Sequence, residues 1–174
     1  MDERRLKAWE PLFARALVLL DSATAAGADI SGWTFGGGTV LMRRHGHRLS
    51  KDIDIFVGDP QILGFLSPRL NPRAEALTAQ YVEQGNFLKL FFEEGEIDFV
   101  ASAPLTENPT SVEVIAGREI RVETSTEIVA KKIWHRGAAF KARDIFDLAL
   151  LMEKAPQALR QIAPVLRERR NDVL

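Results

Sequence analysis

The chain has 174 residues, of which 46% are hydrophobic and 27% charged, and its formal net charge is −1. These values are ordinary for a soluble globular protein, and the length suits one compact domain. The balanced charge excludes a broad basic face as the main source of affinity for nucleic acid. The lack of cysteine excludes disulfides, zinc–thiolate sites and thiol catalysis. We expect a cytoplasmic protein with no membrane association, because the charged first residues are unlike a signal peptide and no apolar run approaches about 20 residues.

The first part of the chain mixes helical and extended patterns. Apolar residues recur every three or four positions over residues 2–26, which predicts a helix with one buried face. A strand is expected over residues 30–35, a helix over residues 39–45, and a second strand over residues 52–57. Two prolines within residues 61–80 predict a short helix, a loop and another short helix.

The middle of the chain is rich in strands. Alternating apolar residues and two turn signals, Glu93-Glu94-Gly95 and Ala116-Gly117, predict two hairpins. The strands are expected at residues 81–82 with a continuation, 87–92, 96–101, 111–115 and 118–124.

The last third is predicted to be helical. Thr124 and Glu127 have capping-box spacing before a helix that reaches Arg136. A second helix over residues 141–153 is expected to turn Ile145, Leu148, Ala149 and Met152 inward, and a last helix ends in the charged residues 167–170. We therefore predict an α+β fold, a mixed sheet flanked by helices. Residues 1–124 would form the core and residues 125–174 a C-terminal helical part packed on it as one compact domain.

Three acids stand between apolar residues on expected strands. Asp52 and Asp54 are two positions apart, so they face the same side of a strand, about 6–7 Å apart. Asp98 has a similar setting, and it can face them if its strand lies beside the first. Carboxylates that converge repel each other unless a cation lies between them, and magnesium prefers oxygen ligands. The alternative is a solvated edge strand with acids facing water.

A glycine turn precedes the first two acids. Gly36, Gly37 and Gly38 run directly into the helix expected from Thr39. Backbone N–H groups at such a turn favour bound phosphate, and the Thr39 hydroxyl can add a donor. By themselves, three glycines show only that the backbone needs freedom there.

Together these motifs resemble a known superfamily. Gly37-Gly38, then 13 residues, then Asp52-Ile53-Asp54, and later Ile97-Asp98-Phe99, are similar to the signature of the DNA polymerase β-like nucleotidyltransferases. Within it, GGGTVL, HRLSKDIDIF, AKKIW and ARDIFDL resemble the AbiEii/AbiGii-type toxins of type IV toxin–antitoxin systems. The resemblance runs over residues 36–150. It implies a magnesium-dependent transfer of a nucleotidyl group from a nucleoside triphosphate to an acceptor, with RNA (tRNA in some relatives) as the expected acceptor and a separately encoded antitoxin.

The resemblance also implies roles for individual residues. The triphosphate would be held by Gly37, Gly38 and Thr39. Two magnesium ions, with manganese as an alternative, would be ligated by Asp52, Asp54 and Asp98, and Asp98 would help activate the acceptor hydroxyl.

The C-terminal helices supply the other implied site residues. Lys132 would contact the triphosphate as a catalytic residue, with Lys131 as the alternative if the register shifts by one. The Arg-Asp-x-x-Asp segment would contribute Arg143 and Asp144 to nucleotide binding and Asp147 to catalysis.

Other interpretations remain open at this point. Lys131 and Lys132 could be solvated, and Arg143, Asp144 and Asp147 could form a cap and a salt-bridge cluster. The basic run at residues 43–48 could meet phosphate or RNA, or be an exposed loop. The acceptor could be a small molecule, such as an antibiotic hydroxyl. A catalytically silent relative is disfavoured because Asp52, Asp54 and Asp98 are all present. The sequence leaves the oligomeric state open.

Overall fold

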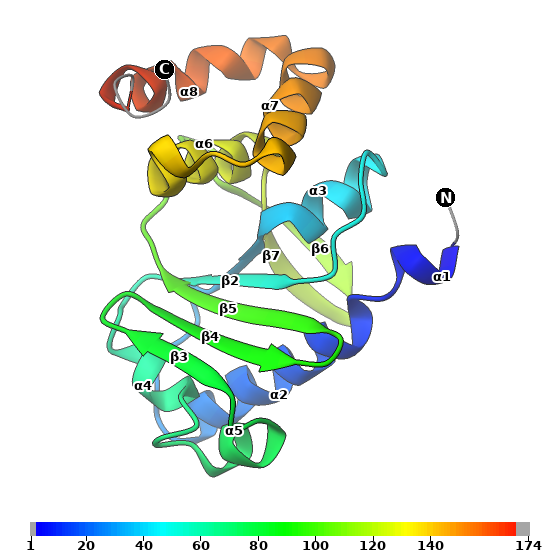
Figure 1. Ribbon diagram of the computed structural model, residues 1–174. Helices are drawn as coiled ribbons and strands as arrows, with labels where there is room; N and C mark the ends of the chain where they lie inside the picture. Colours follow the sequence, from blue (N-terminus) through cyan, green and yellow to red (C-terminus); the bar gives the residue numbers. More distant parts are fainter. Residues whose placement is uncertain (1–2, 170–174) are drawn as a thin grey trace.

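A computed structural model describes residues 3–169 of the chain (Figure 1). Within this range seven strands form one mixed sheet in the order β3-β4-β5-β2-β1-β7-β6. The strands are β1 Thr34–Gly36, β2 Ile53–Val57, β3 Tyr81–Gln84, β4 Phe87–Phe92, β5 Gly95–Ala101, β6 Thr110–Ile115 and β7 Arg118–Glu123. The helices are α1 Glu3–Leu6, α2 Glu10–Ala25, α3 Gly37–His45, α4 Ile62–Leu66, α5 Pro72–Leu77, α6 Ser125–Arg136, α7 Ala142–Lys154 and α8 Leu159–Glu168, with short 3₁₀ turns at Gly137–Ala139 and Pro156–Ala158.

The predicted α+β class is confirmed, and so are both hairpins. Strand β4 pairs antiparallel with β3 and β5, and β6 pairs antiparallel with β7. The centre of the sheet is different: β2 runs parallel to β5 and antiparallel to β1, and β1 runs parallel to β7. Figure 1 shows α2, α4 and α5 on one face of this sheet, whereas α6, α7 and α8 stack above the other face, beyond α3.

Two apolar clusters hold these layers. The larger one joins α2 to the sheet, and the rings of Phe13 and Phe35 lie 4.6 Å apart within it. The smaller one joins α6 to α7 and α8 through residues such as Ile133 and Ile162, both fully buried. Each such side chain stabilises the fold by about 1.5–3 kcal/mol. The boundary at residue 124 stays a prediction. Within residues 3–169, no helix has the length and hydropathy needed to cross a membrane.

Two expectations for the N-terminal part were wrong. Residues 3–26 form two helices instead of one, because Pro11 lies in the first turn of α2 and favours a new start there. Asp2, the expected first residue, lies outside the described residues. The strand expected over residues 30–35 is shorter and later, at Thr34–Gly36. Asp29 accepts hydrogen bonds from the backbone and the hydroxyl of Ser31, and this turn delays the strand.

The orientation of α7 was also predicted wrongly. Ile145 and Met152 were expected inside, but they are 58% and 52% exposed. The inner face instead carries Asp144 and Asp147, which are fully buried. The helix turns this way because basic side chains from other parts of the chain bind both carboxylates.

Candidate active site

The acids meet where two neighbouring strands run side by side. Parallel strands β2 and β5 pair in register, with Asp54 opposite Asp98. Their neighbours, Ile53 and Ile97 among them, are fully buried on the other face. Asp52 lies just before β2 instead of within it, and its carboxylate accepts a hydrogen bond from the Glu96 backbone N–H at 3.2 Å. All three carboxylates nevertheless line the same pocket.

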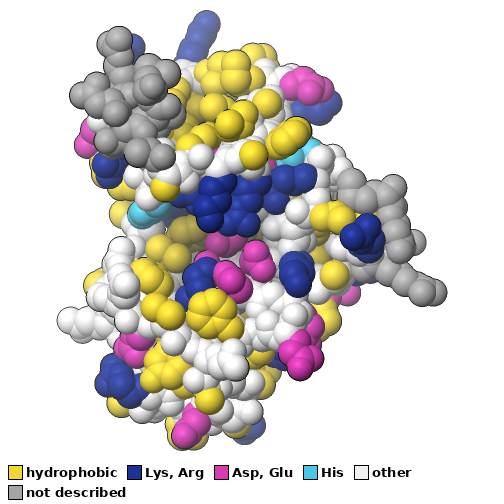
Figure 2. All heavy atoms as spheres, in the orientation of Figure 1, with side chains coloured by type: hydrophobic (Ala, Val, Ile, Leu, Met, Phe, Trp, Pro, Cys, Tyr) yellow, Lys and Arg dark blue, Asp and Glu magenta, His cyan; other side chains and the backbone are white. Residues whose placement is uncertain are grey.

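This charged pocket lies between the sheet and α6. Its acids are Asp52, Asp54, Glu96 and Asp98, and its cations are Arg48, Lys89, Lys132, Arg136, Lys141 and Arg143. Figure 2 shows a dark blue band of Lys and Arg side chains above a group of magenta Asp and Glu side chains, in the hollow between the two halves of the molecule. An adjoining apolar pocket is lined by Phe56, Val100 and Ile128 and shares Asp54 and Asp98 with the charged pocket.

The glycine turn brings backbone close to the acids. Gly37 begins α3 with a φ of +73°, a conformation that favours glycine. A Cβ at this position would also overlap the Asp54 carboxylate. The backbone of α3 therefore starts directly beside Asp54, and a phosphate near this carboxylate would face the first N–H groups of the helix.

The other two residues of the expected phosphate turn are placed differently. Gly38 lies against the Arg48 guanidinium, where a Cβ would leave too little space, and it lines the charged pocket. Thr39 is fully buried, and its hydroxyl donates to the Asp52 carbonyl at 2.6 Å. The hydroxyl expected to meet phosphate is therefore used to hold the segment that carries Asp52.

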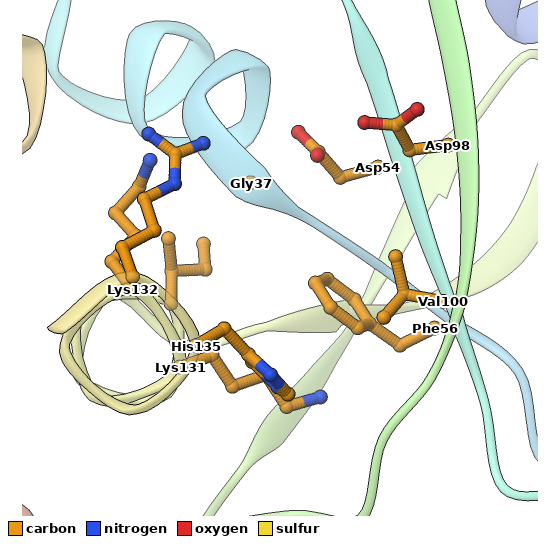
Figure 3. A pocket seen from close by; sticks show the side chains of 10 residues that line it. Gly37, Asp54, Phe56, Asp98, Val100, Lys131, Lys132 and His135 are labelled. Atoms are coloured by element: carbon orange, nitrogen blue, oxygen red, sulfur yellow. The ribbon is translucent and has the colours of Figure 1, made fainter. Parts of the chain in front are cut away.

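Helix α6 supplies the cations across the pocket. Figure 3 shows Lys132 on α6 across from Asp54 and Asp98 on their strands. The Lys132 ammonium is 3.1 Å from Asp144 Oδ1 and 3.3 Å from Asp147 Oδ2. Arg136 lies one turn further and donates to both Asp144 oxygens at 2.7 Å. Lys132 and Arg136 line both pockets.

Asp144 and Asp147 on α7 form ion pairs with these cations of α6. Neither carboxylate is exposed. Asp147 also accepts two hydrogen bonds from Arg48, each of 2.8 Å, and lies 2.6 Å from His47 Nε2. Burial alone would raise the pKa of Asp147, but the hydrogen bonds from Arg48 and His47 keep it below its ordinary value. Of the salt-bridge cluster that the sequence left open, Asp144 and Asp147 are members and the exposed Arg143 is not, and the two acids position Lys132 and Arg48.

The rest of the basic run also joins elements of the fold. Arg43 and Arg44 pair with Glu113 on β6, at 3.0 and 2.6 Å. His45 Nε2 lies 3.1 Å from the Ser125 hydroxyl at the start of α6. The run from residue 43 to 48 thus ties α3 to β6, α6 and α7, and Arg48 alone among these residues lines the charged pocket.

Lys131 and Arg143 have contrasting surroundings. The Lys131 ammonium is buried, 2.6 Å from Glu123 Oε1 and 3.9 Å from the centre of the Phe56 ring. Burial raises the pKa of Glu123 to about 7, although Lys131 opposes this. Arg143 is exposed at the rim of the charged pocket. Of the two lysines that the sequence could not separate, Lys132 is the one that faces the acids in the charged pocket.

The acids have the character of cation ligands. Burial raises the pKa of Asp54 although the charges of Lys132 and Arg136 oppose this, so its negative charge is only partly compensated within the protein. Burial, together with the nearby Asp54, raises the pKa of Asp98 to about 6. Asp98 Oδ1 is buried and accepts no hydrogen bond within the described structure. The side chains as they stand bring no group of three or more metal-ligating residues together within residues 3–169. The open oxygen of Asp98 and the raised pKa values of both acids fit an added cation.

The sequence analysis missed four charged residues of the site. Lys89, Glu96, Arg136 and Lys141 all line the charged pocket. Lys89 is a single charge within the apolar strand FLKLFF, and Arg136 lies one helical turn after Lys132. These two spacings were the available signals.

Comparison with known proteins places the chain among nucleotidyltransferases. Residues 18–173 match the family described as nucleotidyl transferase AbiEii toxin, type IV toxin–antitoxin system. Among curated proteins, no match is found. The fold is similar to the solution structure of the antibiotic-resistance factor ANT(2'')-Ia, with 17% identity, a TM-score of 0.57, and coverage of 91% of this chain and 94% of that one. A crystal structure of ANT(2'')-Ia in complex with adenylyl-2''-tobramycin gives 17% identity, a TM-score of 0.54, and coverage of 88% and 98%. Because the family match spans most of the chain, this protein belongs to the AbiEii family of nucleotidyl transferase toxins.

Proposed function

We propose that this protein transfers a nucleotidyl group from a nucleoside triphosphate to an acceptor hydroxyl on RNA, tRNA included, and that the reaction needs magnesium. The observation that carries the proposal is the charged pocket. In it, Asp54 and Asp98 from paired strands face Lys132 and Arg136 from α6, with the start of α3 beside them. A triphosphate with a bound divalent cation needs cationic groups for its phosphate oxygens and carboxylates for the metal, and this pocket has the two kinds of group facing each other.

Each side of the pocket has a part in this proposal. The first N–H groups of α3, together with Arg48, Lys132 and Arg136, bind the triphosphate. The nucleoside extends into the apolar pocket along Phe56 and Val100, because that pocket opens from the same pair of acids. Lys131 lines this pocket while its ammonium stays paired with Glu123, so it supports the nucleoside part of the site. Arg143 at the rim is placed to meet the acceptor.

Magnesium is assigned to the acids. Asp54 and Asp98, with Asp52 beside them, would hold it, and bound magnesium would neutralise charge on the phosphates during transfer. In the metal-free protein the pKa of Asp98 is about 6, so its carboxylate is ionised at neutral pH, and we assign it to accept the proton of the acceptor hydroxyl. Asp144 and Asp147 act as positioning residues, because their oxygens already bind cations of the chain.

The second candidate differs only in the acceptor. The fold resembles that of a resistance factor solved with an adenylylated aminoglycoside, so a small-molecule hydroxyl is the alternative to RNA. Both candidates use the same residues of the charged pocket.

Nucleotidyl transfer is tested with labelled substrates. Purified protein is incubated with magnesium and each of the four triphosphates, labelled at the α-phosphate, together with total RNA, purified tRNA or a panel of aminoglycosides. We expect label on RNA, and no label when magnesium is chelated. Label on the small molecules alone would move the assignment to the second candidate. No transfer from any triphosphate to any acceptor would contradict both.

The affinity for magnesium should depend on pH through Asp98. The raised pKa means that the folded protein holds a proton on Asp98 at pH 5, whereas magnesium binds the carboxylate. We expect the magnesium affinity to fall about tenfold between pH 7 and pH 5, by calorimetric titration. Without metal, the same shift lowers stability as pH rises from about 4 to 6, because the unfolded chain releases this proton first. An affinity that does not change over this range would contradict the role of Asp98.

A further inference from the structure

Asp98 already has a cationic partner. Lys89 on β4 lies opposite Asp98 on β5, and its ammonium is 2.9 Å from Asp98 Oδ2. The same ammonium is 2.6 Å from Glu96 Oε2, two residues earlier on the same face of β5. Among the described residues, Lys89 is the single ion-pair partner of Asp98, whereas Asp54 has none. Burial alone would lower the pKa of Lys89, but hydrogen bonds to Glu96 and Asp98 raise it, so the ammonium is charged.

The two partners of Lys89 are not equivalent. Asp98 faces Asp54 and keeps one buried oxygen without a partner. Glu96 is further towards the surface, with a side chain that is 39% exposed. The Lys89 ammonium can therefore keep its ion pair with Glu96 when another cation binds Asp98.

We propose that Lys89 is the resident counter-ion of Asp98, which a divalent cation must displace, and that Glu96 then retains the Lys89 ammonium. This inference rests on the proposed magnesium-dependent function and deepens it. It assigns Lys89 as a positioning residue that keeps the acid cluster together before metal binds, and Glu96 as its second partner.

The physical basis is competition between like charges. An ammonium and a divalent cation on one carboxylate lie only a few ångströms apart and repel each other. In a half-buried pocket this repulsion is weakly screened, so the resident lysine lowers the affinity for metal. In return, it offsets part of the repulsion among the carboxylates of the metal-free protein.

The first test measures metal binding in place of activity. Magnesium and manganese affinities are measured by calorimetry, and manganese also by its free-ion spin resonance signal, for wild type and Lys89→Met, which removes the charge and keeps the apolar stem. We expect at least about tenfold tighter binding in Lys89→Met. Lys89→Gln is the second variant, with the same expectation, and it replaces the first if Met disturbs folding.

Lys51→Met is the matched control. Lys51 is an exposed lysine next to Asp52 that does not line the charged pocket, and its charge acts on Glu94 outside that pocket. Because its charge is screened by solvent, we expect less than about a twofold change in metal affinity. Equal tightening in Lys51→Met and Lys89→Met would overturn the specific role of Lys89, as would unchanged or weaker binding in Lys89→Met. If wild type and all variants bind no divalent cation, even with a non-hydrolysable triphosphate, the proposed function itself fails.

The second test isolates Glu96. Glu96→Gln is made in wild type and in Lys89→Met, and the metal affinities form a double-mutant cycle. In wild type we expect about a tenfold loss, because Lys89 then has only Asp98 as a partner. In Lys89→Met we expect a clearly smaller loss. Equal losses in both backgrounds would show that Glu96 is itself a metal ligand, and this would overturn its assignment as the second partner of Lys89.

Discussion

Asp54→Asn is expected to lower kcat/KM for nucleotidyl transfer by at least about 1,000-fold, because the amide has no negative charge to hold the divalent cation. The fold should remain. Burial raises the pKa of Asp54, which means that its ionised form is disfavoured in the folded protein. We therefore expect a Tm at pH 8, without metal, that is no lower than that of the wild type. The measurements are α-labelled transfer assays and thermal unfolding followed by circular dichroism.

Glu107→Gln is the control for this substitution. Glu107 is exposed and lies outside both pockets, so the same loss of one negative charge should leave transfer and Tm unchanged. Activity of Asp54→Asn above about a tenth of wild type, at saturating magnesium, would remove Asp54 from the reaction. We therefore expect Asp54→Asn to be inactive and at least as stable as the wild type. This combination is typical of an active-site charge that the reaction needs and that destabilises the folded protein.

The strands that carry the acids could be predicted from local pattern. Alternation over residues 52–57 and 96–101 placed Asp54 and Asp98 on strands between apolar neighbours, and the structure pairs these strands in register. The glycine turn before a helix indicated a phosphate site, and the family resemblance implied that its ligand is a triphosphate. The side-chain contacts around that turn were harder to predict, because the Thr39 hydroxyl donates to a backbone carbonyl 13 residues away in the sequence. Nothing in the local sequence shows that this donor is already used.

The face of α7 was the main failure, and its cause is tertiary. A periodicity argument turns Ile145 and Met152 inward, because it treats apolar residues as the buried ones. The structure buries Asp144 and Asp147 instead, since Lys132 and Arg136 from α6 and Arg48 from the loop after α3 bind them, with His47 of the same loop beside Asp147. The partners Arg48 and Asp147 are 99 residues apart. Such a cluster is stable only as a whole, so no single segment predicts it.

Asp147→Asn is expected to lower the free energy of unfolding by about 3–5 kcal/mol at pH 7. The carboxylate is fully buried, and its replacement leaves Arg48 and Lys132 without their shared counter-charge. For a chain of this size, the corresponding drop in Tm is about 10 °C. Urea unfolding gives the free energy directly. Glu153→Gln on the same helix is the control, because Glu153 is 71% exposed and, among residues 3–169, forms an ion pair with Lys154 alone. This substitution should change the free energy of unfolding by less than about 0.5 kcal/mol.

The pH dependence separates loss of this charge from loss of packing. Hydrogen bonds hold the pKa of Asp147 below its ordinary value, so its contribution is present at neutral pH and is lost as pH falls through the pKa of the folded state. The stability difference between wild type and Asp147→Asn should therefore shrink below about pH 4. If this stability difference stays constant down to pH 3, the effect of the substitution comes from changed packing and not from loss of the charge. Because Asp147 also holds Lys132 at the charged pocket, the variant should lose transfer activity even at temperatures where it remains folded, and Glu153→Gln should keep it.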